Sequence, residues 1–147
     1  MGFLFTAILA GLIATTGMTL VLWAITRSGW TNADMVRALG SAITGKYEDS
    51  ARVGLIIHYS AGIPIALLYA LAISLIHTES FFFILLAGTA FGFVHGFAFG
   101  FVLVELAEHH PVEQFKEADF QVAVAHLIGH VVYGFLVGLV LGLSKVL

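Results

Sequence analysis

Long apolar runs alternate with short polar segments along this chain. A helix rises about 1.5 Å per residue, so roughly 20 apolar residues cross a hydrocarbon core of about 30 Å. Four runs reach that length, and they cover about residues 3–25, 53–76, 81–106 and 120–143. The sequence therefore predicts an all-α polytopic membrane protein. We expect its four transmembrane helices to form a bundle, with residues 1–147 as a single transmembrane domain.

The polar segment after the first run has a helical pattern of its own. Thr31 is placed like a capping hydroxyl, and Asp34 follows three residues later. The apolar residues that then share one helix face are Met35, Val36, Leu39 and Ile43. We expect a helix over about residues 32–44 that lies at the membrane interface, with Trp30 and Tyr47 as anchors.

Small residues recur at every fourth position of the apolar runs, which places them on one face of each helix. The row in the third run consists of Gly88, Gly92, Gly96 and Gly100. The row in the last run consists of His126, His130, Gly134, Gly138 and Gly142. Glycine faces let two backbones approach closely, and in lipid such contact supplies much of the association between helices. We expect all the glycines of these rows to be helix-packing residues of a glycine zipper, either within one chain or against a second membrane subunit.

The two halves of the chain also align with each other. Placing His58 over His126 puts Gly62 over His130. Each half holds two spans, so the halves keep the same orientation and would be related by an axis along the membrane normal. Either two helix-pair repeats or the shared composition of membrane helices explains this alignment, and both alternatives stay open.

Composition limits the classes of function that fit. Of 147 residues, 60% are hydrophobic and 10% are charged, whereas about a quarter of the residues in a typical soluble domain are charged. The four spans use nearly the whole chain, so any chemistry lies within or beside the bundle. The sequence has no cysteine, which excludes disulfides and thiolate ligands. The net charge of −3, without a basic patch, argues against nucleic acid as a partner.

Basic residues are distributed unevenly between the two ends of the bundle. Those in the loops after the first and third spans are Arg27, Arg37, Lys46, Arg52 and Lys116. The other side holds Lys145. Short loops rich in Lys and Arg stay in the cytoplasm. We therefore expect loops 26–52 and 107–119 to be cytoplasmic.

Four of the seven histidines lie in predicted spans, where ionisable side chains are costly and usually face the bundle interior. Counting inward from the cytoplasmic boundary places His58 and His126 at a shallow depth. His130 lies one turn deeper, and His95 lies near the middle of the membrane. Glu105 is at the shallow end of the third span. The sequence thus predicts a polar histidine cluster on the cytoplasmic side.

Several interpretations of this histidine cluster remain open, and the simplest is hydrogen bonding between helices. The His126-x-x-x-His130 spacing suits one transition-metal ion. The candidate metal ligands are His58, His126, His130 and Glu105. A haem b is another alternative, with His95 and His130 as candidate axial ligands. A proton or solute pathway is a further alternative, because histidine titrates near neutral pH.

Three groups of residues resemble a family of small, uncharacterised four-helix bacterial inner-membrane proteins. The groups are residues 35–41, residues 54–58 with 66–70, and His126 with residues 132–134 and Gly138. The resemblance implies a four-helix fold and a bacterial inner membrane. It implies no activity, and no catalytic residue is carried over from it.

The sequence contains no nucleophile elbow, phosphate loop or dinucleotide fingerprint. We therefore expect no catalytic residues. The function that we expect is that of an accessory or assembly subunit of a membrane complex, or of a homo-oligomer. Binding of a metal or haem by histidine, and transport of protons or a solute, are the alternatives. The expected partners are the lipid bilayer and further membrane subunits.

Overall fold

The computed structural model describes residues 2–144 as an all-α protein, with no strand in that range. Its elements are α1 (Phe3–Ser28), α2 (Met35–Thr44), α3 (Ser50–Ser74), α4 (Phe81–Glu108), the 3₁₀ turn η1 (Glu113–Phe115) and α5 (Phe120–Ser144). The helices α1, α3, α4 and α5 are long and apolar enough to cross a membrane. The predicted fold class is confirmed. Lys145, which entered the predicted charge asymmetry, lies outside the described residues.

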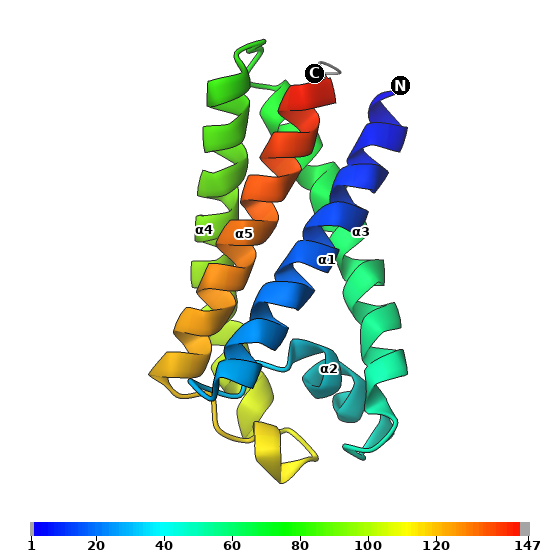
Figure 1. Cartoon of the computed structure of the whole chain (residues 1–147), viewed down its shortest axis with the longest axis vertical. Helices are drawn as coiled ribbons and strands as arrows, with labels where there is room; N and C mark the ends of the chain where they lie inside the picture. Colours follow the sequence, from blue (N-terminus) through cyan, green and yellow to red (C-terminus); the bar gives the residue numbers. More distant parts are fainter. Residues whose placement is uncertain (1, 145–147) are drawn as a thin grey trace.

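The four long helices run side by side (Figure 1). The helix α5 packs against α4 on one side and against α1 on the other, and α3 packs against α1. The helices α3 and α4 make few contacts with each other. A two-fold relation between the halves would give α3 and α4 the contact that α1 and α5 make. The bundle therefore departs from that symmetry at α3 and α4.

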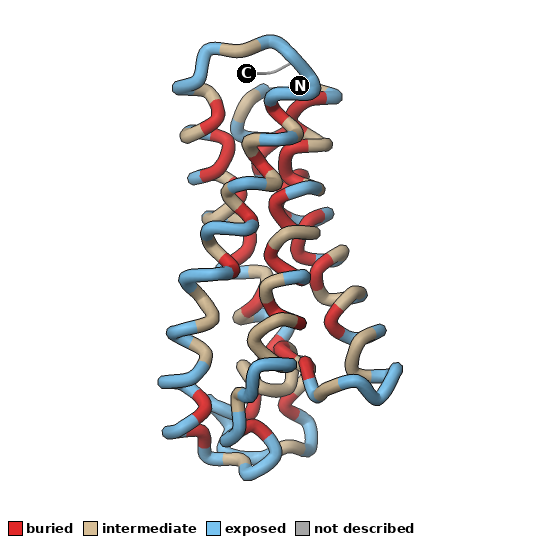
Figure 2. Tube along the Cα trace, turned by 90° about the vertical axis from the view of Figure 1, so that its left-hand side faces the viewer, coloured by how far each residue is buried: buried red, intermediate tan, exposed pale blue. Residues whose placement is uncertain are grey.

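Small side chains fill the inside of the bundle, and large apolar ones cover its outside. Ala7, Ala10 and Ala14 on α1 are fully buried, whereas Phe82 and Phe101 on α4 are 66% and 70% exposed. Buried positions face inward along the long helices, and exposed positions line the periphery (Figure 2). This is the reverse of a soluble protein, whose largest apolar side chains lie inside. The outer surface is suited to lipid.

Among the four long helices, the closest approach of two backbones lies between α4 and α5. A methyl group added to Gly88 would lie 2.6 Å from the Gly134 carbonyl oxygen, and one added to Gly92 would meet the His130 carbonyl oxygen. Each helix therefore places backbone against the backbone of the other. The other glycines of the two rows that approach the facing helix are Gly96, Gly138 and Gly142.

Gly100 departs from this row. A methyl group there would have no neighbour within 4 Å. No backbone of α5 therefore lies opposite this last glycine of the row. Within residues 2–144 of this chain, Gly100 therefore packs against no other helix, and its predicted packing role stays a prediction for a second subunit.

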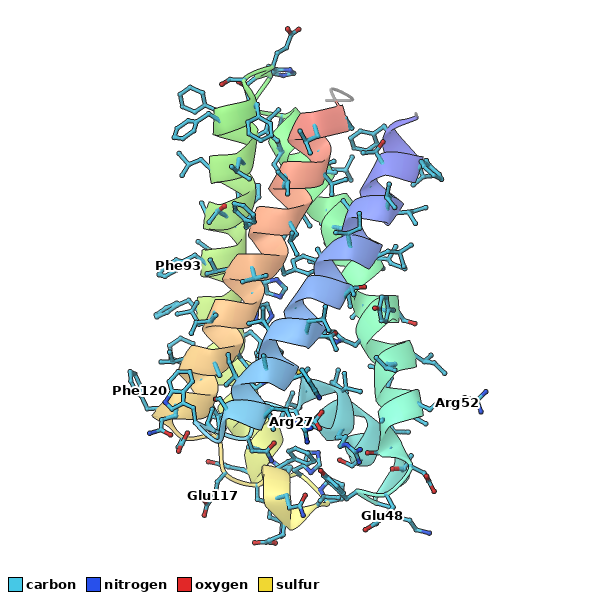
Figure 3. The ribbon with its side chains drawn as sticks, viewed as in Figure 1. Arg27, Glu48, Arg52, Phe93, Glu117 and Phe120 are labelled. Carbon is cyan, nitrogen blue, oxygen red and sulfur yellow. The ribbon has the colours of Figure 1, made fainter. Side chains whose placement is uncertain are left out.

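The short helix α2 is fastened to the start of α3. It begins at Met35, because the side chain of Asp34, rather than that of Thr31, caps it by accepting a hydrogen bond from the Arg37 amide at 3.0 Å. A methyl group added to Gly54 would meet the Val36 carbonyl oxygen. This contact brings α2 beneath the bundle, at the end where Figure 3 places Arg27, Arg52 and other charged residues.

Candidate functional site

A cavity of about 140 Å³ lies at the side of the bundle where α3 and α4 make few contacts. We call it the inner cavity. Its polar side chains are His58, His95, His130 and Tyr133. Its apolar wall includes Met18, Met35, Leu39, Ile57, Ile65 and Phe99. The structure thus brings three of the predicted histidines, from α3, α4 and α5, to one apolar space.

A second cavity of about 300 Å³, here called the outer cavity, adjoins the first. The two share wall residues Met35, Leu39, Ile57 and Phe99. The outer cavity continues between α2, the end of α4 and the loop before α5, and His126 lies in its wall. An apolar space therefore extends from the middle of the bundle toward the end where α2 lies.

The two histidines of α5 use the same nitrogen to bond their own helix. His126 Nδ1 lies 2.8 Å from the Val122 carbonyl oxygen, and His130 Nδ1 lies 2.8 Å from the His126 carbonyl oxygen. A carbonyl oxygen only accepts, so in both rings Nδ1 carries the hydrogen and donates it. In the neutral form of each ring, Nε2 then presents a lone pair.

His58 reaches the same state through a different partner. Its Nδ1 lies 3.3 Å from the Thr19 hydroxyl oxygen, which donates its own hydrogen to the Thr15 carbonyl oxygen at 2.7 Å. Because that hydroxyl hydrogen is already used, the Thr19 oxygen accepts and His58 Nδ1 donates. Nε2 of the neutral His58 ring is therefore an acceptor as well.

The remaining polar groups of the inner cavity are His95, which bonds to Tyr69, and Tyr133, which bonds to the backbone. His95 Nδ1 lies 3.1 Å from the Tyr69 hydroxyl oxygen. The Tyr133 hydroxyl donates to the Gly62 carbonyl oxygen at 2.5 Å, two residues before Pro64 in α3. This bond ties α5 to the middle of α3.

The Nε2 atoms of His58, His126 and His130 have no hydrogen-bond partner within residues 2–144. In that same range, Thr15 Oγ1 is the one fully buried side-chain polar atom that lacks a partner. The three Nε2 atoms therefore keep some accessible surface, although their residues are buried. These residues line the cavities, so the lone pairs are available to a molecule inside them.

Glu105, the fourth predicted metal ligand, lies apart from this site. Its side chain is 74% exposed and lies 3.7 Å from His109 Nδ1, whereas the three histidines predicted with it are buried. In the part of the chain that the structure describes, no group of three or more His, Asp or Glu residues is arranged to hold a metal ion. The donor set therefore does not fit the predicted metal site.

The predicted haem ligands His95 and His130 are in direct contact. Their ring centroids are 4.6 Å apart with an interplanar angle of 68°. Axial ligands lie on opposite faces of a macrocycle, so both rings would have to separate to admit one. The observed packing does not fit haem between them.

Two residues of the site, Met18 and His110, carry no signal in the sequence that indicates their role there. Met18 is an ordinary apolar residue in its helix, and it reaches the inner cavity only because α1, α3 and α5 meet there. His110 was also missed. Its Nε2 donates to the Ala38 carbonyl oxygen at 3.0 Å, and this bond holds the loop after α4 against α2. A histidine outside the spans has no periodic pattern that would indicate this contact.

The fold and the site define an integral membrane protein with four apolar helices and an apolar cavity that contains histidines. The chain belongs to a family of unknown function, DUF6789, whose family model matches residues 1–145. The expected relation to an uncharacterised family is thereby confirmed. None of the curated proteins and none of the solved structures matches the chain.

Proposed function

We propose that this membrane protein binds a lipid-soluble small molecule in the inner cavity. The observation that carries the proposal is an apolar cavity with unpartnered histidine nitrogens where α3 and α4 fail to pack. Ligand pockets combine apolar walls with a small number of polar groups that orient the ligand. A molecule dissolved in the bilayer reaches this side of the bundle without passing through water.

The dimensions of the two cavities support this proposal. A cavity of about 150 Å³ with apolar walls is large enough to bind a benzene ring. The inner cavity, at about 140 Å³, is close to that size. The adjoining outer cavity, at about 300 Å³, has mostly apolar walls and receives an alkyl chain.

Blocking the inner cavity tests the proposal. The probe is a phenyl diazirine with an alkyl tail and no hydroxyl group, photolysed with the protein in lipid nanodiscs. We expect it to label residues of the cavity wall, and we expect Ala61→Phe, in that wall, to reduce the labelling about tenfold. Ala98→Phe, at an exposed position of α4 outside the cavity walls, is the matched control. Equal labelling of the two variants contradicts the proposal.

A second role, as an accessory subunit of a membrane complex or as a homo-oligomer, is favoured by the surface around Gly100. This glycine has no facing neighbour within 4 Å, and Phe97 and Phe101 beside it are exposed. A small position between large side chains admits a helix from another subunit. We expect Gly100→Leu to dissociate such an assembly on native gels while the protein stays folded. An unchanged assembly contradicts this role.

We further propose that the α2 end faces the cytoplasm of a bacterial inner membrane. The support is the group of basic residues in the loops at that end. Because the sequence has no cysteine, single cysteines report the orientation. We expect Glu79→Cys to react with a membrane-impermeant maleimide in intact cells and Glu48→Cys to react only after lysis. The opposite result reverses the orientation.

A further inference from the structure

We infer that the ligand is a lipid-soluble hydroquinone or phenol whose hydroxyl group donates a hydrogen bond to Nε2 of His58 or His130. This inference rests on the proposed function, and it identifies the chemical class of the ligand. Three properties of the cavity carry it: the direction of its hydrogen bonds, its size and the nature of its walls.

The hydrogen-bond directions at His58 and His130 favour a ligand that donates a hydrogen bond. His130 Nδ1 donates to the His126 carbonyl oxygen, and His58 Nδ1 donates to Thr19, so Nε2 of each neutral ring is an acceptor. The Tyr133 hydroxyl in the same cavity has already donated to the Gly62 carbonyl oxygen. A ligand with only acceptor groups would leave both Nε2 atoms unpaired in an apolar space, which is unfavourable. A ligand hydroxyl satisfies one of them.

The size and walls of the inner cavity select an aromatic ring. Its volume of about 140 Å³ is enough for one six-membered ring. The Phe99 and His130 rings lie in its wall with centroids 4.9 Å apart. Flat rings pack on such walls with offset or edge-to-face geometry. The outer cavity, which shares Phe99 and Leu39 with the inner one, receives the apolar tail.

Three probes with the same alkyl tail test the inference on the full-length protein in nanodiscs under anaerobic conditions. They are an alkyl hydroquinone, the corresponding quinone and the hydroquinone dimethyl ether. Only the first donates a hydrogen bond. We expect its Kd, measured by calorimetry, to be about tenfold lower than that of the other two, since a neutral hydrogen bond contributes at most about that factor.

Histidine variants locate the acceptor. We expect the preference for hydroquinone over the ether to disappear in the double variant His58→Phe and His130→Phe, which keeps aromatic rings at both positions. The matched control is His77→Phe, outside the cavity walls. Because a double variant in the bundle can fail to fold, each single variant is measured too, and each is expected to reduce the preference.

Each outcome has one meaning. Equal affinity for the three probes overturns the hydroquinone inference and leaves the proposed function standing, because the ring and tail still bind. A preference for hydroquinone that survives in every folded histidine variant also overturns the inference. Failure of all three probes to bind, together with cavity labelling that Ala61→Phe does not change, overturns the proposed function itself.

Discussion

Helix α4 has two contrasting sides: one packs closely against α5, and the other leaves a gap toward α3. The two sides differ in the residues that line them. On one side, Gly88 and Gly92 of α4 lie against the backbone of α5. On the other side, His95 and Phe99 of α4 line a cavity toward α3. The helix therefore packs where a row of glycines faces it, and it stays apart where larger side chains intervene.

The positions of two glycines in α3, Gly54 and Gly62, explain why this helix does not close the gap. Gly54 lies against Val36 of α2, and Gly62 lies against Thr15 of α1. Both glycines thus lie against α1 and α2. A helix with one small face makes one line of close contact, so α3 has no matching face for α4. The inner cavity results because the glycines of α3 pack against α1 and α2 instead of against α4.

The largest expected effect on stability comes from adding a side chain in the contact between α4 and α5. A side chain at Gly134 would meet the Gly88 carbonyl oxygen, and its Cβ would lie 2.7 Å from the Gly92 Cα. Backbone atoms cannot move aside, so we expect Gly134→Leu to reduce the free energy of unfolding by about 3 kcal/mol or more. Thermal unfolding in detergent measures it. Gly100→Leu, with open space at its Cβ, is the control and is expected to change stability by less than about 0.5 kcal/mol.

An intermediate effect on stability is expected in the loop after α4, at the end of the bundle where α2 lies. His110 is buried and donates from Nε2 to the Ala38 carbonyl oxygen, while its Nδ1 accepts from the Val112 amide at 3.1 Å. We expect His110→Leu to cost about 1–2 kcal/mol and to speed hydrogen exchange in residues 109–119 and in α2. His109→Leu, whose side chain is 74% exposed, serves as the control. Unchanged exchange in the His110 variant would show that this bond does not hold the loop.

A smaller effect on stability is expected from removing the hydrogen bond that links α5 to α3. The Tyr133 hydroxyl bonds the Gly62 carbonyl oxygen and so links α5 to α3 beside the cavity. Side-chain hydrogen bonds between membrane helices contribute about 0.6 kcal/mol on average and at most about 1.7. We expect Tyr133→Phe to lower the Tm accordingly. Tyr59→Phe removes an exposed bond to Thr16 and should lower it less; the reverse order would contradict the bridging role.

The smallest effect should have the opposite sign. Thr15 Oγ1 is buried against Gly62 and has no hydrogen-bond partner in the described chain. An unpaired buried hydroxyl is unfavourable, and valine has nearly the same shape. We expect Thr15→Val to raise stability by about 0.5 kcal/mol, measured as a higher Tm. Thr16→Val removes bonds to Leu12 and Tyr59 and is expected to lower it. A destabilised Thr15 variant would show that this hydroxyl has a partner.

Much of the fold was predictable because it depends on local properties. The thickness of a bilayer and the rise of a helix convert apolar runs directly into four long helices. Glycines at every fourth position likewise mark a helix face regardless of what lies opposite. The partner of each face was not predictable in this way. Gly100 belongs to the same row as Gly92 but has no helix against it.

The candidate site was predictable only in its residue types. The histidines in the spans stand out because ionisable side chains are rare at that depth. Their association with Glu105 does not hold, since that side chain points outward beside His109. Met18 carries no local signal, yet it lines the inner cavity. Which side chains from separate helices meet depends on how each helix is rotated about its own axis.

The amino-acid sequence alone established a membrane protein with four apolar helices, the small faces on those helices and the unusual histidines within them. These features follow from composition and from the 3.6-residue helical repeat. Both depend only on residues that are close together in the chain. The packing of the helices determined that α4 packs against α5 and makes few contacts with α3. It also determined that three histidines share one cavity and which ring nitrogen of His58 and His130 has no hydrogen-bond partner in the described chain. Those features depend on contacts between residues far apart in the chain, and such contacts exist only once the helices have packed.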